Sequence, residues 1–112
     1  MDVVPKYRFE RMVREALDDL PDELHHVLDN VAVQVVDRHP DEPELLGLYE
    51  GVPHTELTGQ EGPDVVSIYR LALCEMCDDL DDLADEVYVT VIHEVAHAAG
   101  IDDERLHELG WG

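Results

Sequence analysis

The chain has 112 residues, of which 45% are hydrophobic, and its 28 acidic residues against seven lysines and arginines give a formal net charge of −21. This length predicts one domain over residues 1–112, and the apolar content excludes a disordered chain. The negative charge excludes nucleic acid and anionic membranes as expected partners, because both would be repelled. No apolar run approaches the length of a membrane span and Met1–Lys6 lacks the features of a signal peptide, so a cytoplasmic location is expected.

Two helices are predicted before the first strand. Arg8–Leu20 carries apolar residues at the i, i+3, i+4 spacing of an amphipathic helix, with charged residues on the opposite side. Pro21 ends this helix and can open a second, short one, because its ring fixes φ at a helical value. Asp29 and Asn30 then indicate a turn. Both helices are expected to serve as scaffold.

Three strands are predicted in the middle of the chain. Val31–Val36 is nearly continuous in β-branched residues, which indicates a strand with both faces largely covered. Shorter strands are predicted at Leu45–Tyr49 and Val65–Tyr69. The two prolines and four acids of residues 37–44 indicate a loop, and the Gly, Pro and Thr content of Gly51–Pro63 indicates a long connection at one end of the sheet.

The chain has two cysteines, Cys74 and Cys77, in one C-x-x-C pair. Such a pair can be a redox couple or half of a structural zinc site. The surrounding residues Leu71–Cys77 instead indicate a short apolar helix, in which cysteine behaves as a small hydrophobic residue. We therefore expect both to be buried free thiols.

A long helix is predicted from the acidic stretch Asp78–Asp82 to about Ala99, because acids at a helix start complement its free N–H groups. A helical projection gathers its core residues into one broad stripe and puts two histidines, His93 and His97, on the other side with Glu86. The histidines are therefore expected to face a cleft or solvent. The stripe comprises Leu80, Ala84, Val87, Val91, Val95 and Ala98.

The second half of this helix carries the pattern H-E-x-x-H-x-x-G-x-x-D, from His93 to Asp103. Residues four apart lie one above the other on a helix, so His93 and His97 can bind one ion. Glu94 is free to act on a water bound to that ion. Gly100 can end the helix by taking positive φ, and the chain can then bring a third ligand back toward the ion. This spacing predicts a catalytic zinc site.

The third ligand has several candidates in the tail, where residues 102–112 predict a short capped helix. Asp103 stands at the position that such sites use, and it is ranked first. His107 is ranked second, because one helical turn after Asp103 it could bind the ion or orient Asp103. Asp102 and Glu104 are close competitors, and Asp103 could instead serve only as the cap of the tail helix.

Three protein ligands leave one zinc position for water, which Glu94 would deprotonate for attack on a carbonyl group. A hydrogen-bond donor for the resulting oxyanion is also expected. The available hydroxyl groups belong to Tyr49, Tyr69 and Tyr88, of which Tyr88 projects from the core side of the helix and is the least suitable.

The motif from His93 to Asp103, followed at once by Glu104–Gly110, resembles the small bacterial zincin-like metallopeptidases, also called mini-zincins or minimal MMP-like domains. The resemblance extends over nearly the whole chain and includes Arg8–Glu10, Leu28–Val31, Leu46–Gly51 and Ile68–Arg70. It implies an α+β fold, with a short three-stranded mixed sheet packed beside the active-site helix and the N-terminal helices.

The same resemblance implies one Zn²⁺ per chain held by His93, His97 and Asp103, with Glu94 as catalytic base. It also implies that an edge strand, Gly47–Tyr49 or Val65–Tyr69, binds an extended peptide or protein substrate by β-augmentation. The leading hypothesis is thus a zinc-dependent metallopeptidase. Its alternatives are a non-catalytic zinc-binding or protein-interaction domain with a zincin fold, and a metal-dependent amide hydrolase acting on a small molecule.

Overall fold

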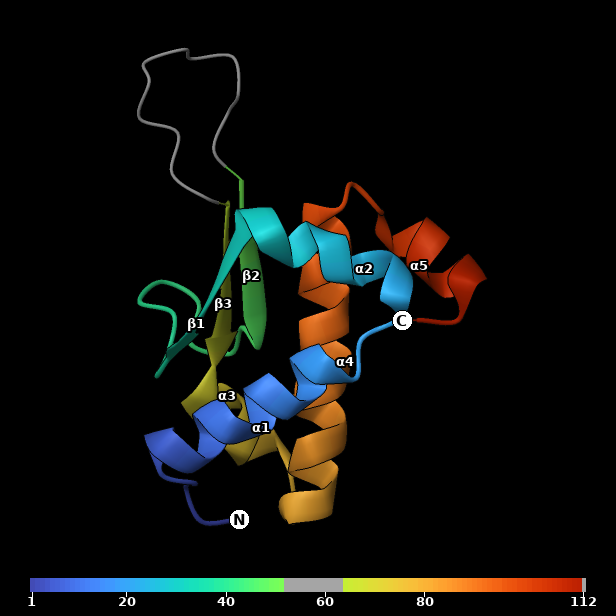
Figure 1. The fold of residues 1–112 in the computed structure, drawn as a ribbon. Helices are drawn as coiled ribbons and strands as arrows, with labels where there is room; N and C mark the ends of the chain where they lie inside the picture. The colour runs from blue at the N-terminus through green and yellow to red at the C-terminus, as the bar shows by residue number, and fades with distance from the viewer. Residues whose placement is uncertain (52–63, 112) are drawn as a thin grey trace.

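The computed structural model describes residues 1–51 and 64–111, which form an α+β fold with a three-stranded mixed sheet, as predicted (Figure 1). Apart from Gly51, the connection predicted over Gly51–Pro63 lies outside these residues. The elements in chain order are α1 Lys6–Asp18, α2 Asp22–His25, the 3₁₀ helix η1 His26–Asn30, β1 Val31–Val36, β2 Gly47–Glu50, β3 Asp64–Tyr69, α3 Arg70–Met76, α4 Leu80–Ala98 and α5 Asp103–Leu109.

The first helix, α1, begins and ends two residues earlier than the predicted range Arg8–Leu20. Its start is set by Pro5, whose carbonyl accepts hydrogen bonds from the Arg8 and Phe9 N–H groups and which needs no N–H of its own there. The helix buries Phe9, Val13 and Ala16 on one face, as the spacing predicts. Figure 1 shows α1 crossing α4, so this face closes the core over the long helix.

The sheet has the strand order β1-β3-β2, with β3 parallel to β1 and antiparallel to β2. The central strand β3 buries Val66 and Ile68 completely. β1 exposes Ala32 and Gln34, which lie on the face of the sheet opposite the core residues Val66 and Ile68, so the prediction that both its faces are covered is wrong. The apolar run could not reveal this, because the covering of a face depends on packing between distant segments.

The strand β2 lies directly against α4. A Cβ atom added at Gly47 would lie 2.7 Å from Cγ2 of Thr90 and 3.1 Å from Cγ of Glu94. Only glycine allows a strand and a helix to approach so closely without displacing one of them. β2 begins at Gly47, two residues later than predicted, and α4 runs beside the sheet on its β2 side (Figure 1).

The long helix α4 starts as predicted, with Asp79 as its cap: the Asp79 carboxylate accepts a hydrogen bond of 2.8 Å from the Asp82 N–H. Its core stripe differs from the projection at the N-terminal end, where Leu83 is buried while Leu80 and Ala84 are exposed. Ala84 lines a hollow between α1 and α4, where the two helices do not fill the space between them, and Leu80 lines a second hollow beside the N-terminal residues.

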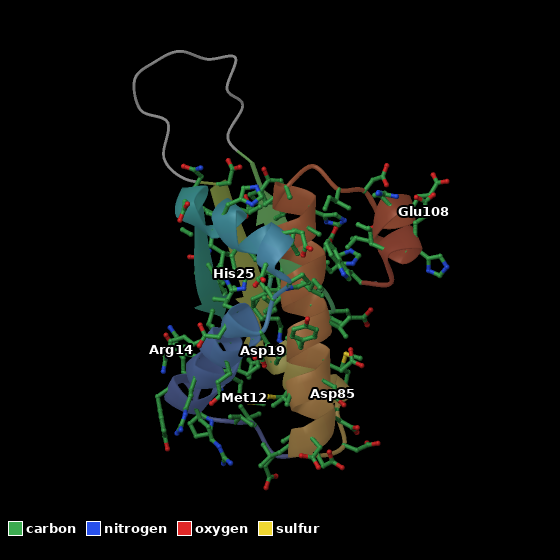
Figure 2. The ribbon with its side chains drawn as sticks, turned by 45° about the vertical axis from the view of Figure 1, so that its right-hand side comes forward. Met12, Arg14, Asp19, His25, Asp85 and Glu108 are labelled. Atoms are coloured by element: carbon green, nitrogen blue, oxygen red, sulfur yellow. The ribbon has the colours of Figure 1, made fainter. Side chains whose placement is uncertain are left out.

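Figure 2 shows Met12 of α1 and Asp19, just after that helix, beside Asp85 of α4, and these three residues line that hollow. From Val87 onward the predicted stripe is confirmed, because Val87, Val91 and Val95 are fully buried. Although α4 has 19 residues, neither it nor another helix in residues 1–51 and 64–111 is long and apolar enough to cross a membrane.

The two cysteines lie at the end of α3 and just after it. Cys74 and Cys77 are both buried and both free, as predicted. Burial raises the pKa of the Cys77 thiol, and the negative charge of Glu86 adds to this effect, so the thiol stays neutral. Within the described part of the chain, neither cysteine joins a group that could hold a metal ion.

We predict that Gly47→Ala destabilises the fold by about 1–3 kcal/mol, because the new methyl group overpacks the contact between β2 and α4. Chemical denaturation monitored by circular dichroism measures this loss. Thr90→Ser removes Cγ2, the nearest atom, and keeps the hydroxyl group. The double variant should therefore recover part of the loss, and simple additivity of the two substitutions would contradict the close contact.

Candidate metal centre

Two histidines stand one turn apart on α4 and face the same way. The ring centroids of His93 and His97 are 4.4 Å apart, and their side chains are 36% and 29% exposed. They are thus outside the fully buried stripe of α4, as the helical projection predicts. Half-exposed imidazoles that share one direction can reach a common ion and still leave it open to solvent.

The turn after α4 reverses the chain toward these histidines. Gly100 has a φ of +83°, which L-residues rarely adopt, and its N–H donates to the His97 carbonyl. The Ile101 N–H donates to the Ala96 carbonyl at 2.9 Å, which completes a Schellman motif. The predicted helix break at Gly100 is therefore confirmed, and its geometry starts α5 beside the C-terminal half of α4 (Figure 1).

The cap of α5 is Asp102, not Asp103. The Asp102 carboxylate accepts a hydrogen bond of 2.9 Å from the Arg105 N–H, which satisfies a free donor of the first turn. Asp103 is the first residue of the helix, and its carboxylate remains available for other contacts. The alternative in which Asp103 serves only as the cap is therefore wrong.

The Asp103 carboxylate lies against both histidines. Its Oδ1 atom is 2.8 Å from Nε2 of His97 and 3.2 Å from Nε2 of His93. The hydrogen bond to His97 lowers the pKa of the Asp103 carboxyl, and the charge of His93 adds to this. Ligands about 2.0–2.1 Å from a tetrahedral zinc lie roughly 3.3 Å from one another. The Asp103 oxygen is thus about as far from each imidazole nitrogen as two zinc ligands lie from one another.

Glu94 is the charged side chain with the least exposure at this centre. Its side chain is 10% exposed, and its Oε1 atom lies 3.7 Å from Nδ1 of His97. Burial raises the pKa of the Glu94 carboxyl, while the two histidines and a hydrogen bond from the Tyr49 backbone oppose the rise. Ligand atoms of His93, Glu94 and His97 lie within 4.8 Å of one another, so this group could hold a metal ion.

The other candidates for the third ligand occupy different positions. Asp102 caps α5, and the side chains of Glu104 and His107 are exposed on that helix. Among the described residues, the group that could hold a metal contains His93, Glu94 and His97 and no residue of the tail, Asp103 included. Asp103 differs from the other candidates because its carboxylate directly contacts both histidines. The residues that the structure brings together are His93, Glu94, His97 and Asp103.

The tyrosine hydroxyl groups named as oxyanion donors lie in different surroundings. The Tyr49 hydroxyl donates a hydrogen bond of 2.8 Å to Asp64. The Tyr69 ring is buried and packs edge-on against His39, and burial raises the pKa of its hydroxyl. An oxyanion role for Tyr49 or Tyr69 stays a prediction, and for Tyr49 it requires the hydroxyl to exchange its partner.

Among the described residues, β2 is the edge strand on the side of the sheet next to this centre. β3 is the central strand, so the prediction that Val65–Tyr69 could be a substrate-binding edge is wrong. Beside β2, the Tyr69 N–H donates a hydrogen bond to the Leu46 carbonyl. Hydrogen-bonded and non-hydrogen-bonded residue pairs alternate along an antiparallel ladder, so the backbone N–H and C=O groups of Gly47 and Tyr49 point away from β3.

Two contributions to the site were missed from the sequence. Gly47 brings β2 against Thr90 and Glu94, and two hollows lie on either side of this contact. An isolated glycine within a strand pattern is a known indication of a close backbone approach, so Leu46-Gly47-Leu48 carried that signal. The hollows depend on how the loop before β2 lies over α4, which no local pattern reveals.

Comparisons with known proteins agree with this geometry. A family model described as zincin-like metallopeptidase matches residues 27–111, which include the sheet, α4 and α5. A comparison with curated proteins found no match. The matched segment covers well over half of the chain and contains all four residues of the centre, so the chain belongs to the zincin-like metallopeptidase family.

Proposed function

We propose that this protein is a zinc-dependent metallopeptidase that binds one Zn²⁺ per chain. The observation that carries the proposal is the approach of one carboxylate oxygen, Oδ1 of Asp103, to the Nε2 atoms of both histidines, with the buried Glu94 beside them. The family implies zinc, and imidazole and carboxylate are donors that zinc accepts.

His93, His97 and Asp103 are the proposed ligands, and Glu94 is the proposed catalytic base. Asp103 Oδ1 approaches the Nε2 atoms of both histidines, whereas Glu94 Oε1 faces Nδ1, the other ring nitrogen of His97. One ion at the Nε2 atoms is therefore within easier reach of Asp103 than of Glu94. Three such ligands would leave a coordination position for water or substrate.

When bound, zinc supplies Lewis acidity, which makes a water molecule more acidic and polarises a carbonyl group. The chain's own contribution is proton transfer at the Glu94 carboxylate. The pKa of Glu94 is raised toward neutral pH. A base whose pKa lies near the working pH is effective both in accepting a proton and in returning it to the leaving amine.

The free edge of β2 supports a peptide as the substrate. The outward backbone groups of Gly47 and Tyr49 can pair with an extended chain, and the contact of Gly47 with α4 sets that chain beside the histidines. An edge strand gives affinity through main-chain hydrogen bonds, so a peptide or an extended protein segment suits it better than a small amide.

We predict that the purified protein contains about one zinc per chain, and that His93→Ala and His97→Ala lose it. Asp103→Ala should weaken zinc binding by at least about 100-fold, which is more than expected for loss of a residue that only hydrogen bonds to a zinc ligand. Metal analysis and competition with a chelator measure both effects, and His107→Ala is the control that should bind zinc as wild type does. If Glu94→Gln loses zinc while Asp103→Ala keeps it, the two carboxylate roles are reversed.

We further predict that Glu94→Gln keeps its zinc and lowers kcat/KM for peptide hydrolysis by about 10²–10⁴-fold or more, because the base is lost. A library of internally quenched peptides gives the substrate for this assay. Glu108→Gln, which changes an exposed carboxylate on α5, is the matched control and should keep full activity (Figure 2).

If the zinc-loaded wild type cleaves no peptide of that library, the metallopeptidase proposal fails. The non-catalytic zinc-binding or protein-interaction domain would then be the better account.

A further inference from the structure

A separate pocket lies on the His93 side of the metal centre. It has a volume of about 360 Å³ and lies between α4 and residues 44–47, which lead into β2. His93, Glu94 and Gly47 belong to its lining, so it opens next to the proposed reacting groups. A peptide paired with the free edge of β2 places alternate side chains on the α4 side, where this pocket lies.

The lining combines apolar walls with two carboxylates. Leu45, Leu46 and Val89 supply hydrocarbon surface, and Glu44 and Glu86 bring negative charge from opposite elements, the loop before β2 and α4. A lysine or arginine side chain has the complementary form, with an apolar stem and a charged end that stays partly solvated. A neutral apolar side chain would desolvate the carboxylates without replacing their lost hydration.

The carboxylates of Glu44 and Glu86 are not neutralised by any residue in the described part of the chain. Residues 1–51 and 64–111 provide no ion-pair partner for Glu44 or Glu86. Arg38 donates a hydrogen bond to the carbonyl of Pro43, next to Glu44, but its guanidinium is ion-paired with Glu75. The hollow on the other side of Gly47 differs, because Asp102 there caps α5 and Asp103 contacts the histidines.

We infer that this pocket binds a lysine or arginine side chain of the substrate, adjacent to the bond that is cleaved, and that Glu44 and Glu86 determine this specificity. The inference rests on the proposed function for its reaction, but the binding of a basic side chain does not depend on catalysis. The inferred substrate is therefore a peptide or extended protein segment with a basic residue beside the scissile bond.

Hydrolysis is the first test. In internally quenched peptides that differ at one position beside the scissile bond, lysine and arginine should exceed methionine about ten-fold in kcat/KM, as expected for two partly solvated charge pairs. Glu44→Gln/Glu86→Gln should reduce this ratio to about one, and 0.5 M NaCl should reduce it as well. The matched control is Glu15→Gln/Asp85→Asn, which removes two charges from the hollow between α1 and α4 (Figure 2) and should keep the ratio.

Ligand binding without turnover is the second test. The zinc-loaded protein is titrated with n-butylguanidinium and with N-butylurea, its neutral analogue of the same shape, while backbone amide NMR shifts of α4 are followed. Both compounds should shift the amides of Val89 and Thr90, the cation binding about ten-fold more tightly than the urea, and Glu44→Gln/Glu86→Gln should abolish the difference.

The outcomes separate the two proposals. Equal or undetectable binding of the two compounds, or a preference that survives Glu44→Gln/Glu86→Gln, would overturn the pocket's specificity even if peptides are cleaved. Selective binding of the cation with no cleavage of any peptide would support the pocket and reject the metallopeptidase.

Discussion

The close contact between β2 and α4 is the constraint on which the rest of this site depends. Gly47 has no Cβ, and any larger residue would meet Thr90 and Glu94 at less than van der Waals distance. Because the strand lies so close, Gly47 and Tyr49 of β2 line the same hollow as Glu94 and His97. The proposed substrate edge, base and ligands are thus held together by one packing contact.

The metal centre could be predicted from sequence because its geometry is local. The spacing of His93 and His97 fixes their common direction on any helix, and Gly100 ends that helix through a backbone conformation that needs glycine. One local detail was open to error. Asp102 and Asp103 have the same side chain, and only the structure shows that the first caps α5 while the second contacts the histidines.

The features that were wrong or missed depend on contacts between distant segments. Val31–Val36 is apolar enough for a central strand, but the order β1-β3-β2 makes it an edge, and the same order gives β3 no free edge at all. The net charge of −21 likewise does not indicate which acidic residues lie together in the fold. Glu44 and Glu86 become candidates for a binding role only because the fold places both in the lining of a pocket beside His93.

The most direct test of the central claim is zinc K-edge X-ray absorption on the purified, zinc-loaded protein. The account predicts a low coordination number of nitrogen and oxygen atoms at about 2.0–2.2 Å, with scattering from two imidazole rings and no sulfur. A sulfur shell at about 2.3 Å, which would involve Cys74 or Cys77, or a third imidazole, which would implicate a histidine outside α4 such as His107, would contradict it.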